Sequence, residues 1–126
     1  MGTMKVRGIR GATTATANTK EAIYEATGEM LQELVESNGI DPDDIAAATF
    51  STTRDLNAAF PAFVARKKFG WHDVALMCGH EMDVPGSEPQ CIRVLILVNT
   101  EKSPQELKNV YLRGAANLKS IGMEEV

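Results

Sequence analysis

The fold is decided by the stretch Cys91-Ile92-Arg93-Val94-Leu95-Ile96-Leu97-Val98-Asn99, which carries the strongest strand signal in the sequence. β-Branched and leucine residues fill both of its alternating faces, a pattern typical of a strand buried on both sides of a sheet. We therefore expect Cys91 to Asn99 to form a central strand. Arg93 is the residue that interrupts its apolar run.

A buried Arg93 would need an anionic or strongly accepting partner, because desolvating a lone guanidinium is costly. Two kinds of partner fit the sequence. One of the 17 Asp and Glu residues could form a structural ion pair with it, or the side chain could lie in a pocket that receives an anionic ligand. The residues alone leave both interpretations open.

Three more strands are expected around this one. Met4 to Arg10 is short and closes on Gly11, Ala46 to Thr52 combines small and β-branched residues, and Val74 to Met77 is a brief apolar run. Together with the central strand, these segments predict one mixed sheet.

Two helices are expected between these strands. The longer one begins near Asn18, which can cap it with Glu21 three residues later, and it ends at Gly39. The shorter one is opened by Phe60-Pro61 and closed by Gly70.

Two other segments pair a capping residue with a proline. Asp41-Pro42-Asp43-Asp44 predicts one or two helical turns. Ser103-Pro104-Gln105-Glu106 predicts the start of a last helix, whose apolar face would carry Leu107, Val110, Tyr111, Ala115 and Leu118. The fold class expected from these elements is α+β (α/β-like), a mixed β-sheet packed with helices.

Composition limits the size and the partners of the fold. A chain of 126 residues with 44% hydrophobic residues can bury one core but not two, so residues 1–126 are expected to be a single domain. A net charge of −4 disfavours binding to nucleic acid or to an anionic membrane. The longest apolar run, Val94 to Val98, is far shorter than the ~20 residues that span a bilayer, and the N-terminus has no signal-peptide core, so a cytoplasmic protein is expected.

The sequence contains no metal-binding motif. Cys78 and Cys91 have neither CxxC spacing nor a histidine cluster nearby, so both are expected to be reduced thiols. His80-Glu81 lacks the second histidine of a zinc motif, because Val84 stands in its place. We therefore expect no metal.

Two charged residues besides Arg93 stand out. Arg10 ends a strand just before the small residues Gly11 to Thr14, which would let a ligand approach the backbone closely. Glu81 lies in the polar segment Cys78 to Asp83. Arg10 could also be an ordinary surface arginine, and Glu81 could also be part of a solvated turn.

Five segments, in order, span nearly the whole chain: Arg7 to Thr14, Asp55 to Ala62, Cys78 to Val84, Cys91 to Val94 and Val110 to Leu112. No single segment is specific. In their joint order and spacing they resemble the small monofunctional chorismate mutases of the AroH class.

The resemblance implies a homotrimer with a pseudo α/β-barrel core and active sites in the clefts between subunits. It also implies an isomerase activity, the intramolecular Claisen rearrangement of chorismate to prephenate in phenylalanine and tyrosine biosynthesis. That reaction is unimolecular and requires no cofactor.

The resemblance further implies roles for single residues, taken position by position. Arg10 and Tyr111 would bind the enolpyruvyl carboxylate of chorismate. Arg93 would bind that carboxylate and the ether oxygen. Glu81, with the backbone of Cys78, would bind the ring hydroxyl.

Other positions would wall the pocket. Phe60 and Ala62 would come from the neighbouring subunit, with Arg66 near the pocket mouth, and Met77 and Leu118 would add further substrate contacts.

The chain departs from the family pattern in two places. Phe63 stands beside the pocket mouth where some members have a lysine, so a charge is missing there. From about residue 117 the tail reads Asn117-Leu118-Lys119-Ser120 instead of the common Leu-Arg-Pro-Asp-Leu. We expect a flexible tail and carry no role over to Lys119.

Two other functions remain compatible with the residues. One is a trimeric imine or enamine hydrolase, which would also place a strand arginine on a substrate carboxylate between subunits but would not need Glu81 paired with Tyr111. The other is a non-catalytic trimeric protein that binds a small anion. Turnover of chorismate distinguishes the mutase from both.

Overall fold

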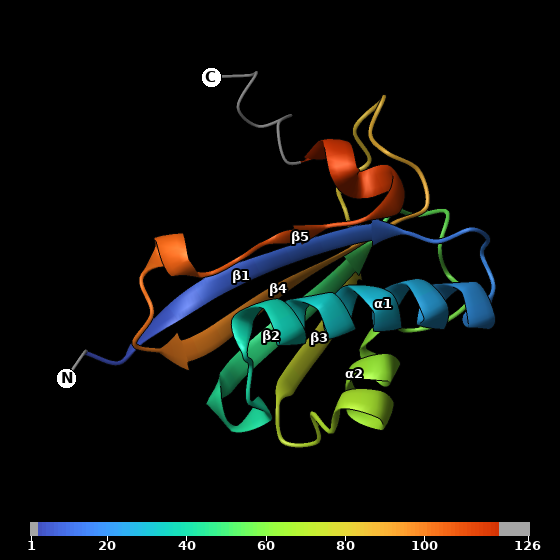
Figure 1. Cartoon of the computed structure of the whole chain (residues 1–126). Helices are drawn as coiled ribbons and strands as arrows, with labels where there is room; N and C mark the ends of the chain where they lie inside the picture. Colours follow the sequence, from blue (N-terminus) through green and yellow to red (C-terminus); the bar gives the residue numbers. More distant parts are fainter. Residues whose placement is uncertain (1–2, 119–126) are drawn as a thin grey trace.

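A computed structural model describes residues 3–118 of the chain and contains a five-stranded sheet in the order β3-β2-β4-β1-β5. The strands are β1 (Lys5–Thr14), β2 (Ile45–Thr52), β3 (Ala75–His80), β4 (Cys91–Thr100) and β5 (Val110–Tyr111). The prediction that Cys91 to Asn99 forms the central strand is confirmed, since β4 lies in the middle of the sheet (Figure 1).

The sheet is mixed, as expected. β4 runs antiparallel to both β1 and β2, whereas β3 is parallel to β2 and β5 is parallel to β1. β1 is longer than predicted because pairing with β4 continues past Gly11 until Thr14 meets Cys91. β3 begins one residue later than predicted and extends to His80.

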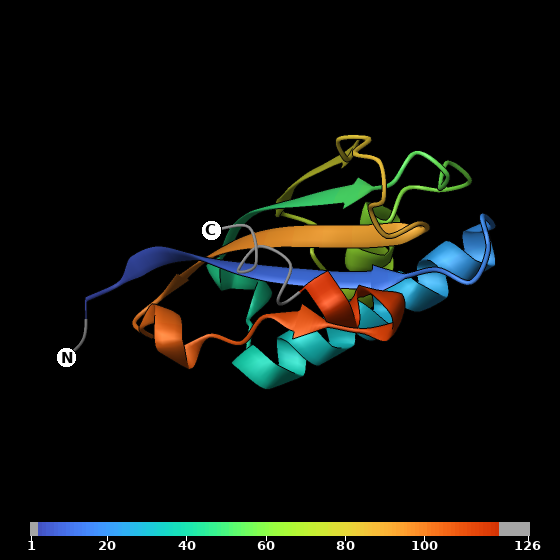
Figure 2. The same ribbon diagram turned by 90° about the horizontal axis from the view of Figure 1, so that it is seen from above.

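Both α-helices cover the same face of the sheet. α1 spans Lys20–Asn38 and α2 spans Ala62–Phe69. They lie below the sheet in Figure 1, and in Figure 2, which looks onto the opposite face, they lie behind the strands. The α+β class is therefore confirmed, and one sheet face carries no α-helix among the described residues. None of these helices is long and apolar enough to cross a membrane.

The expected N-cap of α1 is off by one residue. Thr19 caps the helix, because its hydroxyl accepts a hydrogen bond from the backbone N–H of Ala22 at 3.1 Å. The side chain of Asn18 instead accepts hydrogen bonds from the backbone N–H groups of Asn57 and Ala58. Asn18 thus joins the start of α1 to the segment that precedes α2.

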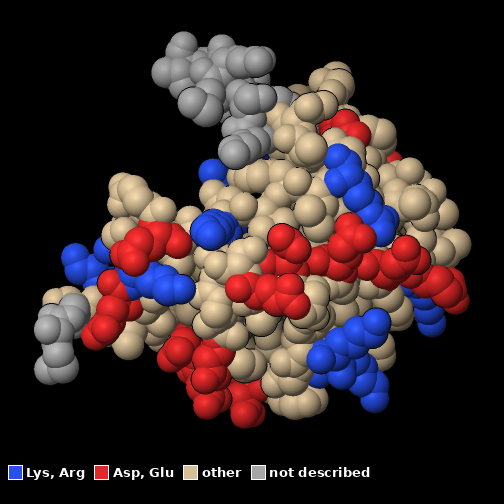
Figure 3. All heavy atoms as spheres, in the orientation of Figure 1, with Lys and Arg blue, Asp and Glu red and all other residues tan. Residues whose placement is uncertain are grey.

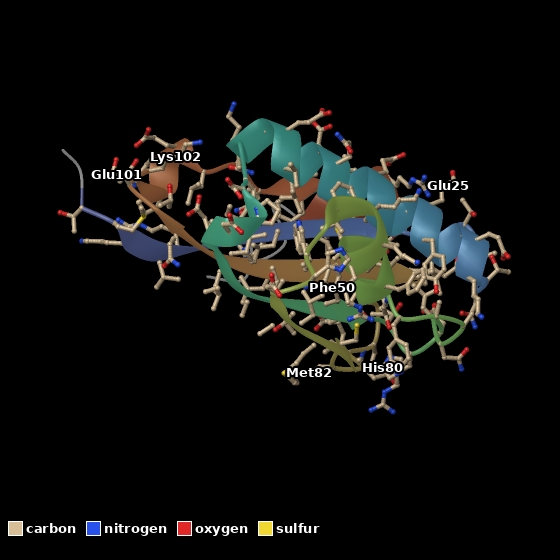
Figure 4. All side chains as sticks on the ribbon, turned by 90° about the horizontal axis from the view of Figure 1, so that it is seen from below. Glu25, Phe50, His80, Met82, Glu101 and Lys102 are labelled. Atoms are coloured by element: carbon tan, nitrogen blue, oxygen red, sulfur yellow. The ribbon has the colours of Figure 1, made fainter. Side chains whose placement is uncertain are left out.

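The main core lies between the helices and the sheet. Phe50 of β2 and Trp71, which follows α2, are fully or almost fully buried there, and Figure 4 shows Phe50 beneath α2. The outer side of α1 carries a row of acidic side chains (Figure 3). α1 is therefore amphipathic, with its apolar side on the sheet.

The prediction that β4 is buried on both faces is wrong for the single chain. Ile92, Val94 and Ile96 face the helices and are buried, but Leu95 and Leu97 on the other face are 43% and 38% exposed. The sequence pattern did show that β4 has apolar residues on both faces. The described chain supplies helices to cover only one of them.

The prediction of a last helix starting at Ser103 is also wrong. The Glu106 carboxylate does accept from the Ser103 N–H, at 2.9 Å, but the helical turn Pro104–Glu106 ends at once and Leu107 is extended. Two strand residues and a 3-10 turn, Arg113–Asn117, follow it. Tyr111 therefore lies on a strand, not on a helix.

Asn38 explains why the chain is extended at this point. Its buried side chain donates to the Lys108 carbonyl at 2.9 Å and accepts from the Lys108 N–H at 2.7 Å. Next along the chain, the Asn109 side chain accepts from the Arg10 N–H at 2.8 Å. These hydrogen bonds compete with helix formation and lead the chain onto the edge of β1.

We expect Asn38→Ala to lower the free energy of unfolding by about 1–3 kcal/mol, because the buried Asn38 side chain loses its two part-buried hydrogen bonds to the backbone of Lys108. Urea denaturation at fixed protein concentration measures this change. Gln32→Ala is the control, since the exposed Gln32 side chain donates to Glu36 on the same helix, and it should change stability by no more than about 0.5 kcal/mol. If both variants lowered the free energy of unfolding equally, the stabilising role of the hydrogen bonds between Asn38 and Lys108 would be contradicted.

Candidate active site

Arg93 lies in a row of residues that crosses the open face of the sheet. Its register partners are Ala12 on β1 and Ser51 on β2, while Ala12 also pairs with Tyr111 and Ser51 with Gly79. The side chains nearest to Arg93 are therefore small. They leave a depression in which a guanidinium and a ligand can both fit.

The next row carries larger side chains. It contains Arg10 on β1, Leu95 on β4, Thr49 on β2 and Met77 on β3. Met77 is 70% exposed, and Arg10 is exposed as well. This row forms one wall of the depression.

A cavity of about 530 Å³ occupies this place. Five residues proposed from the resemblance line it together, and they come from β1, β4, the segment after β3, β5 and the end of the described chain: Arg10, Arg93, Glu81, Tyr111 and Leu118. Glu81 and Tyr111, far apart in the sequence, reach the same cavity because the sheet brings β3 and β5 to either side of the central strands.

Arg93 and Glu81 lie next to each other in the lining of the cavity. The Nε atom of Arg93 lies 3.7 Å from Oε2 of Glu81, which is an ion pair but is longer than a charge-assisted hydrogen bond. This Nε atom is buried and has no hydrogen-bond partner among the described residues. The Arg93 side chain as a whole is 42% exposed, so the guanidinium is only partly buried.

The Glu81 carboxylate has a second partner that we did not single out. The Ser51 hydroxyl donates to Oε2 of Glu81 at 2.5 Å, and the Glu81 N–H donates to the Thr52 carbonyl at 2.8 Å. Ser51 and Thr49 both line the cavity. The alternation of side chains along the predicted strand Ala46 to Thr52 indicated that Thr49 and Ser51 share one face. Only the pairing register with β4 shows that this face lies next to Arg93.

A small apolar cluster closes one side of the cavity. It contains Ala12, Cys91 and Ala115, with Tyr111 and Leu118 packed against it. Burial raises the pKa of the Cys91 thiol, and the nearby Arg93, which hydrogen-bonds the sulfur and stabilises the thiolate, offsets only part of that increase.

Arg113 ties the turn that carries Ala115 to α1. Its Nε atom lies 3.2 Å from the Glu29 carboxylate and its Nη2 atom 3.5 Å from that of Glu25, which Figure 4 shows on α1. The Gly114 N–H donates to the Thr14 hydroxyl. Arg113 has a φ of 52°, a left-handed conformation that these contacts must stabilise.

Two other proposed residues line a second cavity of about 520 Å³. Phe60, which is 71% exposed, and Cys78 lie there together with His80 and Tyr24. Cys78 packs against the main core, so this cavity opens on the helix side of the sheet. Figure 4 shows His80, the last residue of β3, close to the edge of the sheet.

The remaining proposed residues lie outside both cavities. Ala62 is buried at the start of α2 and Arg66 is exposed on the same helix. Met77 is the register partner of Thr49, which does line the first cavity. Phe63, which stands where some members of the family have a lysine, stacks on Tyr24 with ring centroids 5.1 Å apart.

The described residues form no cluster of three or more His, Cys, Asp or Glu side chains that could hold a metal ion. The tail positions around Lys119 lie outside the described residues, apart from Asn117 and Leu118.

Comparison with known proteins gives concordant matches. The family model described as chorismate mutase type I matches residues 6–120. The chorismate mutase AroH of Thermus thermophilus is 48% identical over 115 residues, covering 90% of this chain and 93% of that protein. The chorismate mutase AroH of Bacillus subtilis is 41% identical over 109 residues, covering 86% of each.

A solved structure has the same fold. The chorismate mutase from Clostridium thermocellum superposes with a TM-score of 0.83 at 50% identity, covering 86% of this chain and 96% of that one. The predicted AroH resemblance is thereby confirmed over most of the sequence. The chain belongs to the chorismate mutase type I family.

Proposed function

We propose that this protein is a chorismate mutase, an isomerase that rearranges chorismate to prephenate. The observation that carries this function is the convergence of two arginines, Glu81 and Tyr111 in one cavity of a chain of that family. The reaction supplies a precursor for phenylalanine and tyrosine. The relatives favour neither the imine hydrolase nor the anion-binding alternative.

Chorismate has two carboxylates and reacts by a unimolecular shift in which a C–O bond breaks while a C–C bond forms. A protein accelerates such a step by holding the flexible side chain in a compact conformer and by stabilising the charge that develops on the ether oxygen. Arg93 is suited to the second task. Its guanidinium remains charged, Arg93 lines the cavity, and its buried Nε atom has no hydrogen-bond partner among the described residues.

The other residues position the substrate. Arg10 and Tyr111, at the β1 side of the cavity, would hold the enolpyruvyl carboxylate. Glu81 would accept from the ring hydroxyl and offset part of the positive charge. A carboxylate this close to Arg93 favours a substrate whose hydroxyl group lies next to the ether oxygen that Arg93 would bind.

A complete site requires a second copy of the chain. Arg93 and Glu81 lie on the open face of the sheet, whereas Phe60 and Cys78 lie in the other cavity. Contact between the first cavity of one copy and the second cavity of another would join the two half-sites. Exposed Leu95, Leu97 and Met77 on the open face would be covered in the same assembly.

We infer from these half-sites a homotrimer with active sites between subunits, built from one domain per chain. A closed ring of three gives each open sheet face a partner. A cytoplasmic location is in keeping with Cys78 and Cys91, which are both free thiols.

The direct test is an assay with chorismate alone. Chorismate loses ultraviolet absorbance on conversion, so a mutase shows a decay that depends on enzyme concentration and is accompanied by formation of prephenate. A pure anion-binding protein would leave the absorbance unchanged.

We expect Arg93→Ala to lower kcat/KM by about 10²-fold or more, with a fall in kcat, because one preorganised donor to the developing charge is lost. Arg93→Lys keeps the charge but loses the planar fork, so it should recover only part of the rate. Steady-state kinetics and thermal melting are measured on the same preparations.

The melting data separate catalysis from structure. The ion pair with Glu81 is partly exposed on both sides, so its loss should change stability by no more than about 1 kcal/mol. Near-normal kcat in a folded Arg93→Ala protein would rule out the catalytic role.

We expect sedimentation equilibrium at micromolar concentration to give a trimer, and Leu97→Glu to weaken it, because a carboxylate would be placed in the apolar contact. Leu97→Met is the matched control and should remain associated. Activity should fall together with trimer content. A fully active monomer would contradict the shared site.

We expect Cys78, and not Cys91, to be alkylated by iodoacetamide in the folded protein at neutral pH. The raised pKa of Cys91 keeps it protonated, so its reaction should begin only at a more alkaline pH than that of an ordinary thiol. Mass spectrometry locates the label. Cys78→Ser should retain most activity, since the proposed contact uses the Cys78 backbone, and a large loss would overturn that assignment.

A further inference from the structure

The Arg93–Glu81 pair poses a physical problem for a site that binds an anion. A guanidinium and a carboxylate this close normally approach to about 2.8 Å and form two parallel hydrogen bonds. Such a closed pair would consume the donors of Arg93. A substrate carboxylate or ether oxygen would then have to displace Glu81 before it could bind.

The observed pair is not closed. The shortest separation is 3.7 Å, from Arg93 Nε to Glu81 Oε2, and the Nε donor has no hydrogen-bond partner among the described residues. The same Oε2 atom accepts the Ser51 hydroxyl at 2.5 Å. The hydrogen bond from Ser51 on β2 to the Glu81 carboxylate is therefore shorter than the distance from that carboxylate to Arg93.

Backbone register makes Ser51 suited to this task. Ser51 is the cross-strand partner of Arg93, so the two side chains stand next to each other on the open face. On its other side Ser51 pairs with Gly79, where an added Cβ would meet nothing within 4 Å. The Glu81 side chain can thus fold back over β3 to reach Ser51.

The Glu81 backbone is fixed as well. Its N–H donates to the Thr52 carbonyl at 2.8 Å, which ties the first residue after β3 to the end of β2. With the backbone and Oε2 both held by β2, Oε1 is left to accept a hydrogen bond from a ligand. The carboxylate then has one oxygen for the protein and one for the substrate.

We propose that Ser51 is a positioning residue that holds Glu81 away from a closed ion pair with Arg93, so that both charges remain available to the substrate. This inference rests on the proposed mutase function. Ser51 acts through Glu81 and is not itself a catalytic residue.

The test compares Ser51→Ala with Ser51→Thr in the chorismate assay. Without the hydroxyl, Glu81 closes on Arg93 and the substrate must break that pair, so KM should rise about tenfold while kcat changes by less. Ser51→Thr keeps the hydroxyl, and the open space at Gly79 leaves room for its methyl group. It should restore KM to within about threefold of the wild type.

A second background isolates the ion pair. Glu81→Gln removes the charge that attracts Arg93, so adding Ser51→Ala to it should raise KM much less than in the wild-type background. Ser37→Ala, on α1 at the other side of the sheet, is the matched loss of a hydroxyl and should leave KM unchanged. Circular dichroism verifies that each variant is folded.

Three results would overturn the inference: an unchanged KM in Ser51→Ala, no recovery in Ser51→Thr, or an equal rise in KM in both Glu81 backgrounds. If Ser51→Ala does not fold, Ser51→Cys, a weaker donor of similar size, takes its place with the same expected rise. Wild-type turnover in the same assay separates the outcomes, since its absence would contradict the mutase function and not the role of Ser51.

Discussion

Because β4 pairs antiparallel with β1 on one side and β2 on the other, its residues are forced alternately to the two faces of the sheet, and the rest of the structure depends on this pairing. One set of residues packs under α1 and α2 and builds the core. The other set contains Arg93, Leu95 and Leu97, which meet no α-helix of the described chain. The same strand therefore contributes to the core of the chain on one face and to the proposed active site on the other.

In the proposed mechanism, the charges of Arg93 and Glu81 on that face remain available to the substrate. Arg93 lies among small neighbours, its Nε atom has no hydrogen-bond partner within residues 3–118, and its acidic partner Glu81 accepts a hydrogen bond from Ser51. A tight salt bridge in the same place would add little stability at partial exposure and would block an anionic ligand. The looser arrangement fits the proposed mechanism, in which preorganised donors stabilise developing charge and no nucleophile or acid takes part.

Contacts remote from the cavity also position the residues that line it. Asn38, at the end of α1, holds the backbone of Lys108 and so directs the chain into β5, where Tyr111 enters the cavity. Arg113, in a left-handed conformation, ties the next turn to the acidic side of α1. Both contacts join α1 to the last part of the described chain, so the packing of that helix determines where two sides of the cavity lie.

The sequence by itself determined the central strand, the two α-helices and the family, because periodicity, caps and motif order are local or linear properties. It also singled out Arg93, Arg10 and Glu81 as charges in unusual places. Only the tertiary structure decided that β4 has an open face, that the segment after Ser103 is extended, and that Ser51 lies beside Arg93. Each of these depends on which distant segments lie side by side. A capping box or an alternating run cannot encode that, because hydrogen bonds such as those of Asn38 are made across 70 residues of chain and override the local preference.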